Sequence, residues 1–273
     1  MWRGWHKLPG GDAAFDNLAN IPSSFPSSSG SGPIEIVSSS GENLFASVFD
    51  EIFPNAYYDS IIEAAELKGF DLALLNQGAG QQEKGITMTE IRSGQRCIFD
   101  DVDLANKLWL HVEQHLPHRD VVPGKRYKGW KASGVNPRFR VLKYSSGERF
   151  ELHQDGSYQM EPLRREDGVL IEQQSFVTFQ LYLNNGGGVD FTGGSTRFIQ
   201  PVSSSANSSG VNEASLIDGN HTGINLREIA EVNDVVPKKG RLLLFQHNCW
   251  HEGERVTSGV KYVLRSEIMY IKE

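Results

Sequence analysis

Cysteine, long apolar runs and excess positive charge are all scarce in this 273-residue sequence. The two cysteines, Cys97 and Cys249, are far apart and form no CxxC pair, which argues against both a disulfide scaffold and a thiolate metal site. We expect both thiols to be reduced and partly buried. No run of 18 apolar residues is present, so the sequence predicts no transmembrane helix and no membrane association. The first residues also lack the apolar core of a secretory signal, and we expect a cytoplasmic or nuclear protein.

The charge balance argues against a second class of partner. Acidic residues outnumber basic ones by 34 to 27, which gives a net charge of −7. Such a chain repels phosphate backbones, so we do not expect general nucleic-acid binding, although a local basic groove is compatible with this balance. Hydrophobic residues make up 38% of the sequence, which is enough for a globular domain with a core.

The N-terminal region has the composition of a flexible tail. Residues 22–43 are dominated by Ser, Gly and Pro and contain few apolar side chains. Such a segment buries too little apolar area to fold alone, so we expect residues 1–43 to form a tail that catalysis does not need.

Residues 44–135 form the helical part of the chain and are expected to pack on the domain that follows. Apolar residues recur there at helical spacing. Asn55 and Asp103 are the expected N-caps of two of these helices, and Gly69 is an expected stop. The predicted helices cover residues 45–53, 55–68 and 103–116.

The pattern changes to strict alternation from about residue 138. Short β-rich runs separated by Gly- and Asn-rich turns, with no helix between them, are typical of an all-β sandwich or barrel. We expect this domain to span residues 136–273, with a Ser/Asn/Gly-rich insertion at about 203–229. The expected strands cover residues 138–143, 175–184, 194–202, 240–247 and 261–271.

A histidine–aspartate pair gives the strongest functional signal. His153 and Asp155 are two residues apart, so on a strand both side chains point to the same side and can reach one ion. His251, which follows the strand at 240–247, is the best candidate for a third ligand, and His247 competes with it. Two imidazoles and one carboxylate leave open positions on an octahedral ion, as in non-haem Fe(II) oxygenases. Zinc also accepts these ligands, so the ligand set alone does not determine the metal.

Several further motifs surround these residues in a fixed order. They are Tyr144, Gly147 and Phe150 in YxxGxxFxxHxD, Thr178 to Asn184, Phe191 to Phe198 as FxGGxTxF, Pro237 to Phe245 as PxxGxxxxF, and Gly259 with Lys261 after His251-Glu-Gly. In this order they resemble the 2-oxoglutarate/Fe(II)-dependent dioxygenases of the prolyl 4-hydroxylase type. The resemblance covers roughly residues 136–273. It implies a mainly β fold with helical support, a double-stranded β-helix or jelly roll.

The resemblance also implies an enzyme. His153, Asp155 and His251 would hold Fe(II), and 2-oxoglutarate would chelate the metal as co-substrate. Oxidative decarboxylation with O₂ would release succinate and CO₂ and hydroxylate a C–H bond of the substrate, with ascorbate as a candidate reductant. The protein would supply geometry, a dry pocket and complementary charge, while the metal carries out the difficult chemistry.

The far carboxylate of 2-oxoglutarate would need a cation inside the barrel. By the same resemblance Lys261, ten residues after His251, is the favoured partner. Arg265 is the alternative, because residues 261, 263 and 265 share one face of a strand. Tyr144 and Tyr182 would contribute hydroxyl groups, although either ring is equally compatible with a place in the core.

The substrate is less well defined. The resemblance makes prolyl residues of a protein or peptide the first candidate and leaves small molecules open, since one fold serves many substrates. Arg92, Arg96 and Arg197 are candidate substrate contacts by position alone, and for Arg197 we prefer a place on the outer face of its strand.

Two other functions use the same residues. A cupin-like metal hydrolase or isomerase would share the three ligands but would need no buried cation ten residues after the last histidine. A non-catalytic binding barrel would be expected to have lost a ligand, and none is missing.

Overall fold

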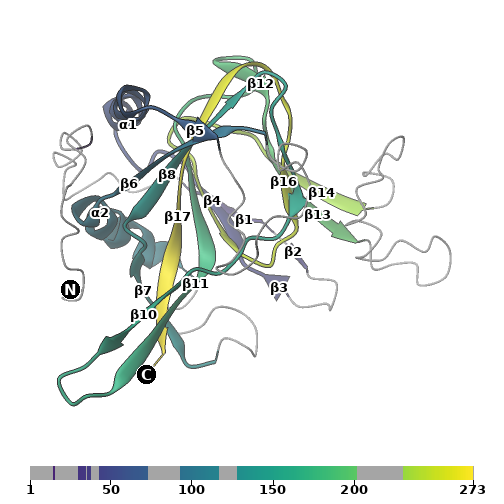
Figure 1. Cartoon of the computed structure of the whole chain (residues 1–273). Helices are drawn as coiled ribbons and strands as arrows, with labels where there is room; N and C mark the ends of the chain where they lie inside the picture. Colours follow the sequence, from purple (N-terminus) through teal and green to yellow (C-terminus); the bar gives the residue numbers. More distant parts are fainter. Residues whose placement is uncertain are drawn as a thin grey trace, which may run out of the picture.

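The fold is described by a computed structural model for residues 15, 30–34, 36–37, 43–72, 93–116, 128–201 and 230–272. Two antiparallel β-sheets form the body of the molecule, and two helices cover the outer face of the larger sheet (Figure 1). This arrangement confirms the predicted mainly β jelly roll with helical support. None of the helices in the described segments is long and apolar enough to cross a membrane.

The larger sheet has the strand order β1-β4-β15-β11-β17-β8-β6-β5, and the smaller sheet the order β14-β13-β16-β9. The larger sheet consists of β1 (Gly30–Pro33), β4 (Ala46–Phe49), β5 (Asp71–Leu72), β6 (Gln95–Asp100), β8 (Arg138–Ser145), β11 (Leu170–Tyr182), β15 (Leu242–Gln246) and β17 (Val256–Lys272), with β7 (Trp130–Val135), β10 (Gln159–Arg164) and β12 (Phe191–Gly193) paired beside this path. The smaller sheet consists of β9 (Phe150–His153), β13 (Thr196–Pro201), β14 (Ala230–Val235) and β16 (His251–Gly253). A separate two-stranded sheet is formed by β2 (Ile36–Val37) and β3 (Asn43–Leu44).

Alternation along β11 and β17 divides the interior into two cores. Phe179 and Leu264 lie on the face that packs against the helices, together with Leu108 of α2. Tyr182 and Val263, which are cross-strand partners, lie on the opposite face, between the two sheets. The inner face therefore carries the side chains that can line a pocket, while the helices stabilise the outer face.

The helices begin and end where local chemistry permits. α1 (Asn55–Lys68) follows Pro54 without a side-chain cap and ends at Gly69, whose φ of 96° suits glycine. α2 (Val102–Val112) continues into a short 3₁₀ turn, η2 (Glu113–His115). The predictions that Asn55 and Asp103 are N-caps were wrong. The cap of α2 is Asp101, whose side chain accepts a hydrogen bond from Leu104 N at 2.8 Å.

The prediction of a helix at residues 45–53 was also wrong. This segment forms β4, which pairs with β15 and has all four residues buried. Because both faces of β4 are covered, its sequence, Ala-Ser-Val-Phe, lacks the alternation of a half-buried strand, and a short buried strand of this kind cannot be distinguished from a buried helix by periodicity alone.

Part of the region expected to be a tail has a defined place. β1 pairs with β4 at the edge of the larger sheet. Phe15 is buried, and its ring stacks on Phe99 with centroids 3.7 Å apart. β2 pairs with β3 within and just beyond the same region. The remaining residues of the expected tail, and the insertion at about 203–229, lie outside the described residues.

Candidate metal centre and adjoining pocket

The smaller sheet brings the three predicted ligands together. His153 ends β9 and His251 begins β16, and the two are paired directly across these neighbouring antiparallel strands. Asp155 follows β9, and its backbone N–H donates to the carbonyl of His247 at 2.8 Å. That bond ties the end of the HxD segment to the turn between β15 and β16. His247 thus supplies a backbone carbonyl, and its ring is not part of the ligand cluster.

The ligating atoms of His153, Asp155 and His251 lie within 4.8 Å of one another, the one such cluster in the described part of the chain. His153 Nε2 is 3.5 Å from Asp155 Oδ1, and His251 Nε2 is 3.8 Å from Asp155 Oδ2. Two imidazoles and a carboxylate on one side of a point can hold a divalent ion and leave its other side open.

Hydrogen bonds determine the tautomer of both histidines. Nδ1 of His153 lies 2.7 Å from the carbonyl of Glu151, and Nδ1 of His251 lies 2.9 Å from the carbonyl of Cys249. A carbonyl can only accept, so Nδ1 carries the proton in each ring and Nε2 presents its lone pair. Burial lowers the pKa of His251 to about 3, so the ring is neutral as a metal ligand must be.

Aromatic contacts hold the two rings in place. Phe150 stacks on His153 with centroids 3.6 Å apart, and Phe245 meets His251 edge-on at 4.6 Å. His153 Nε2 is buried and has no hydrogen-bond partner among the described residues. Because a buried unpaired nitrogen is costly, this atom fits a metal ion that completes its bonding.

Asp155 is the buried anion of the cluster. Thr178 Oγ1 donates to Oδ2, and the guanidinium of Arg265 forms an ion pair with Oδ1. Burial opposes ionisation, but the Arg265 guanidinium holds the pKa of Asp155 well below its usual range. The carboxylate is therefore ionised and ready to bind a cation.

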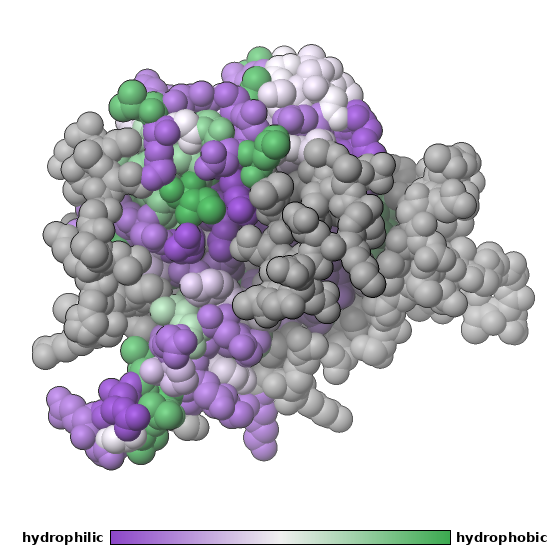
Figure 2. Space-filling view, viewed as in Figure 1, coloured by the Kyte–Doolittle hydropathy of each residue, from purple (hydrophilic) through white to green (hydrophobic). Residues whose placement is uncertain are grey.

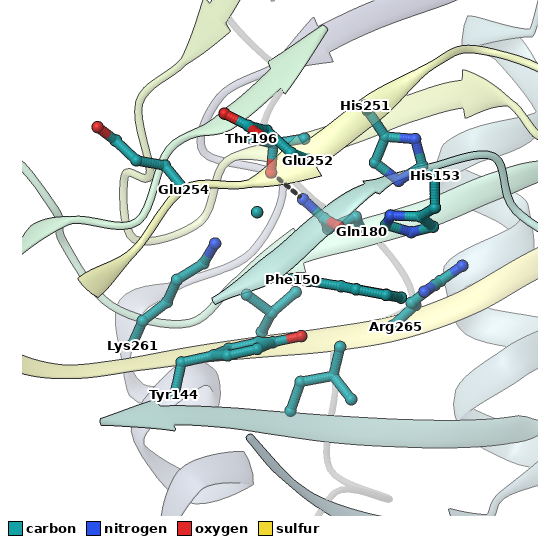
Figure 3. Close-up of a pocket in the computed structure, with 13 residues that line it drawn as sticks. Tyr144, Phe150, His153, Gln180, Thr196, His251, Glu252, Glu254, Lys261 and Arg265 are labelled. Atoms are coloured by element: carbon teal, nitrogen blue, oxygen red, sulfur yellow. Dashed lines mark hydrogen bonds between the residues drawn. The ribbon is translucent and has the colours of Figure 1, made fainter. Parts of the chain in front are cut away.

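A pocket adjoins the cluster and extends along the inner face of β17 (Figure 3). His153, His251 and Arg265 lie at one end of it, and Lys261 lies at the other. Its remaining lining residues come from both sheets and are Leu142, Tyr144, Phe150, Gln180, Thr196, Glu252, Gly253, Glu254 and Val263.

Lys261 is a buried cation that has no carboxylate partner among the described residues. Its side chain is 4% exposed, and Nζ donates to the carbonyl of Gly194 at 2.6 Å. The rings of Tyr144 and Tyr182 each lie 5.6 Å from Nζ. Burial lowers the pKa of Lys261 to about 8. Gly194 permits the close approach, because a Cβ there would lie only 3.2 Å from Cδ of Lys261.

The hydroxyl of Thr196 is oriented by its neighbours. Thr196 Oγ1 accepts from Tyr182 Oη at 2.7 Å and from Gln180 Nε2 at 2.8 Å. With both lone pairs used, its own proton is free to donate, and Thr196 lines the pocket that Lys261 closes. The pocket thus offers an ammonium and a hydroxyl donor, which suits an anionic ligand.

The remaining predicted residues are not all in the pocket. Tyr144 lines it with its hydroxyl directed inward (Figure 3), whereas Tyr182 is fully buried behind it and uses its hydroxyl on Thr196. Arg96 lies opposite Leu142 across β6 and β8, on the inner face beside the pocket. Arg197 forms ion pairs with three acids of the smaller sheet, Asp234, Glu252 and Glu254. Arg92 lies outside the described residues.

Thr196 and Gln180, two polar residues of the pocket, were not singled out as site residues from the sequence. Thr196 belongs to the FxGGxTxF element, and Gln180 shares a strand face with Thr178 and Tyr182. The two-residue periodicity of 178, 180 and 182 was the available signal. It did not reveal which hydroxyl accepts and which donates.

A family model described as the 2OG-Fe(II) oxygenase superfamily matches residues 139–266, which include all the residues of this pocket. No curated protein sequence matches the chain.

The chain is also similar to solved structures at low sequence identity. A prolyl hydroxylase from Trichoplax adhaerens, in complex with a hypoxia inducible factor peptide fragment, is 15% identical with a TM-score of 0.50, over 83% of each chain. A Pseudomonas putida prolyl-4-hydroxylase is 16% identical with a TM-score of 0.47, over 82% of this chain and 91% of that chain. HygX from Streptomyces hygroscopicus, with nickel and 2-oxoglutarate bound, is 18% identical with a TM-score of 0.44, over 82% of each chain.

Proposed function

We propose that this chain, a member of the 2OG-Fe(II) oxygenase superfamily through residues 139–266, hydroxylates a C–H bond of its substrate with 2-oxoglutarate and O₂ as co-substrates. His153, Asp155 and His251 would hold Fe(II), and Lys261 would bind the far carboxylate of 2-oxoglutarate. One observation carries the proposal. A buried ammonium that has no carboxylate partner in the described segments, and a cluster of two histidines and one aspartate, lie at opposite ends of the same pocket (Figure 3).

The residues of the cluster fit a divalent iron. Their donor set is two neutral imidazoles and one ionised carboxylate, and the buried Nε2 of His153 has no other partner among the described residues. The bound Fe(II) would supply the activation of O₂ coupled to oxidation of 2-oxoglutarate, with succinate and CO₂ as products. The chain itself supplies orientation and charge.

The pocket favours one orientation of a bound dicarboxylate, with one carboxylate near the metal and the other near Lys261. Lys261 provides the charge for the carboxylate remote from the metal, and Thr196 can donate a hydrogen bond beside it. Leu142, Phe150 and Val263 form apolar walls that exclude water from the space between the two ends. A metal hydrolase with the same three ligands would have no use for this buried cation.

The substrate class stays open between a peptide and a small molecule. Prolyl residues of a peptide are the first candidate, and Arg96, beside the pocket on the inner face, is the residue best placed to contact a substrate. Ascorbate is expected to support turnover by keeping the iron reduced.

Succinate release tests the proposal. The protein is incubated with 2-oxoglutarate, with and without Fe(II) and ascorbate, across a panel of prolyl peptides and small-molecule fractions. We expect Fe(II)-dependent succinate formation that Asp155→Ala abolishes and that Glu151→Gln, a change of a partly exposed carboxylate on the preceding strand β9, leaves intact. Succinate formation that is absent from the iron-loaded wild type, or that persists without Fe(II), would contradict the proposal.

A further inference from the structure

Arg265 lies at the metal end of the pocket, on the inner face of β17. Its guanidinium pairs with Oδ1 of Asp155, and the two side chains are 16% and 3% exposed. The strand register places Arg265 opposite Gln180 of β11 and opposite Arg140 of β8. Two arginines directly opposite each other repel, so each requires its own carboxylate.

Each oxygen of Glu267, the second carboxylate in this region, already accepts a hydrogen bond from another residue. Glu267 Oε1 accepts from Arg140 Nη1 at 2.8 Å, and its Oε2 accepts from Asn136 Nδ2 at 2.9 Å. Asp155 is the carboxylate that pairs directly with Arg265. In turn, Arg265 compensates Asp155, whose burial would otherwise leave a charge unpaired.

The contact also restricts how the Asp155 carboxylate can turn. The terminal torsion of an aspartate is soft and roughly two-fold, so a single anchor leaves its plane poorly defined. Here Arg265 contacts one oxygen while Thr178 Oγ1 donates to the other. Each oxygen has two lone-pair directions, so each can keep its donor and still face the point between His153 and His251.

We propose that Arg265 is a positioning residue for the metal centre: it holds the Asp155 carboxylate in the orientation that binds the metal, and it does not bind the far carboxylate of 2-oxoglutarate. This inference rests on the proposed function for the identity of the metal ligands. The two cations of β17 then have different roles, because Lys261 at the other end of the pocket binds the far carboxylate of 2-oxoglutarate. Loss of a group that orients a metal ligand commonly weakens metal binding about tenfold to a hundredfold.

Metal affinity, measured without turnover, tests the inference. Mn(II) binding to the full chain is followed by calorimetry in the absence of 2-oxoglutarate, for Arg265→Gln, Arg265→Lys and the control Arg138→Gln. Arg138 is a largely exposed arginine of β8 that pairs with Asp100. We expect Arg265→Gln to weaken Mn(II) binding at least tenfold, Arg265→Lys to recover part of the loss, and the control to match the wild type.

A thermal cycle on the metal-free protein provides a second measurement. Arg265→Gln leaves the buried carboxylate of Asp155 without its cation and should lower the melting temperature. The double variant Asp155→Asn with Arg265→Gln removes both charges and should regain most of the lost melting temperature. Additive losses in the cycle would overturn the pairing. This cycle remains informative if Arg265→Gln alone folds poorly.

The outcomes separate this inference from the proposed function. Wild-type Mn(II) affinity in Arg265→Gln, together with a raised 2-oxoglutarate requirement, would overturn the positioning role and assign Arg265 to the co-substrate. If the wild type turned over no 2-oxoglutarate, the proposed function would fail. The positioning role of Arg265 would then still be decided by Mn(II) affinity and the thermal cycle.

Discussion

Lys261 and Arg265 lie four residues apart on the same face of β17 and line opposite ends of one pocket (Figure 3). Lys261 has no carboxylate partner among the described residues and donates to a backbone carbonyl, whereas Arg265 is paired with Asp155. The sequence left these two residues as alternatives for one task. Their different surroundings favour two tasks, one at the co-substrate and one at the metal.

Replacing Lys261 with glutamine should raise the 2-oxoglutarate requirement steeply. Loss of one partner of a buried ion pair costs roughly 3–5 kcal/mol, which corresponds to a dissociation constant at least about a hundredfold higher. Mn(II) affinity should stay unchanged, because Lys261 contacts none of the three ligands. Calorimetry with Mn(II) and then with 2-oxoglutarate measures both, and Lys143→Gln, which removes a lysine paired with Glu66, is the control. An unchanged 2-oxoglutarate affinity would exclude Lys261 as its partner.

The binding of 2-oxoglutarate should depend on pH. Burial lowers the pKa of Lys261 to about 8, so in the free protein the ammonium is charged below that pH and neutral above it. Because the co-substrate needs the charged form, its dissociation constant should be nearly constant below about pH 8 and rise about tenfold per pH unit above it. Lys261→Arg, which stays charged, should lack this rise. A wild-type affinity that does not change between about pH 7 and about pH 9.5 would contradict the assignment.

Thr196→Val should weaken 2-oxoglutarate binding by about tenfold or more, since a hydrogen bond to a charged group contributes about 1.5–3 kcal/mol. The change keeps the shape of the side chain and removes the donor. Tyr182→Phe removes a hydroxyl from the same hydrogen-bonded group without removing a lining residue, and should have the smaller effect. Titration of both variants with 2-oxoglutarate decides the order, and the reverse order would place Tyr182 at the co-substrate.

Asp155→Ala should abolish hydroxylation, because it removes the one carboxylate of the ligand cluster. The same change leaves Arg265 without its anion, so the metal-free variant should also unfold at a lower temperature. Metal content after reconstitution and succinate release measure the first effect, and thermal unfolding measures the second. A variant that kept iron and full turnover would show that the carboxylate ligand lies elsewhere, with Glu148 and Glu151 next to test.

A chain that begins near Glu42 should keep the metal site but lose stability. The site residues all lie between 142 and 265. Truncation, however, removes the pairing of β1 with β4 and the buried ring of Phe15 on Phe99, and loss of a buried phenylalanine side chain costs about 3–5 kcal/mol. Thermal unfolding and Mn(II) binding of the shortened chain test this. Loss of Mn(II) binding in a folded protein would mean that the N-terminal region supports the site directly.

Short-range patterns in the sequence predicted an all-β domain and the pair of His153 and Asp155, whereas the jelly roll was implied by the resemblance that the ordered motifs carry. Alternation of period two reveals strands, and an HxD pair on a strand places two ligands on one side. The same reasoning failed for β4, where burial on both faces removes the alternation.

The partners of Asp155 and Thr196 could not be predicted from the sequence. The contact of Arg265 with Asp155 joins residues 110 positions apart, and it depends on strand register and on Glu267 being occupied by Arg140 and Asn136. The donor role of Thr196 depends on two hydrogen bonds that it accepts from β11. Such relationships arise from three-dimensional packing and have no local signature.

A crystal structure of the protein with Mn(II) and 2-oxoglutarate tests the central claim most directly. We expect the metal on His153 Nε2, His251 Nε2 and one oxygen of Asp155, with 2-oxoglutarate chelating it and its far carboxylate on Lys261. A 2-oxoglutarate bound outside this pocket, or one whose far carboxylate rests on Arg265 while Lys261 stays on Gly194, would contradict the account.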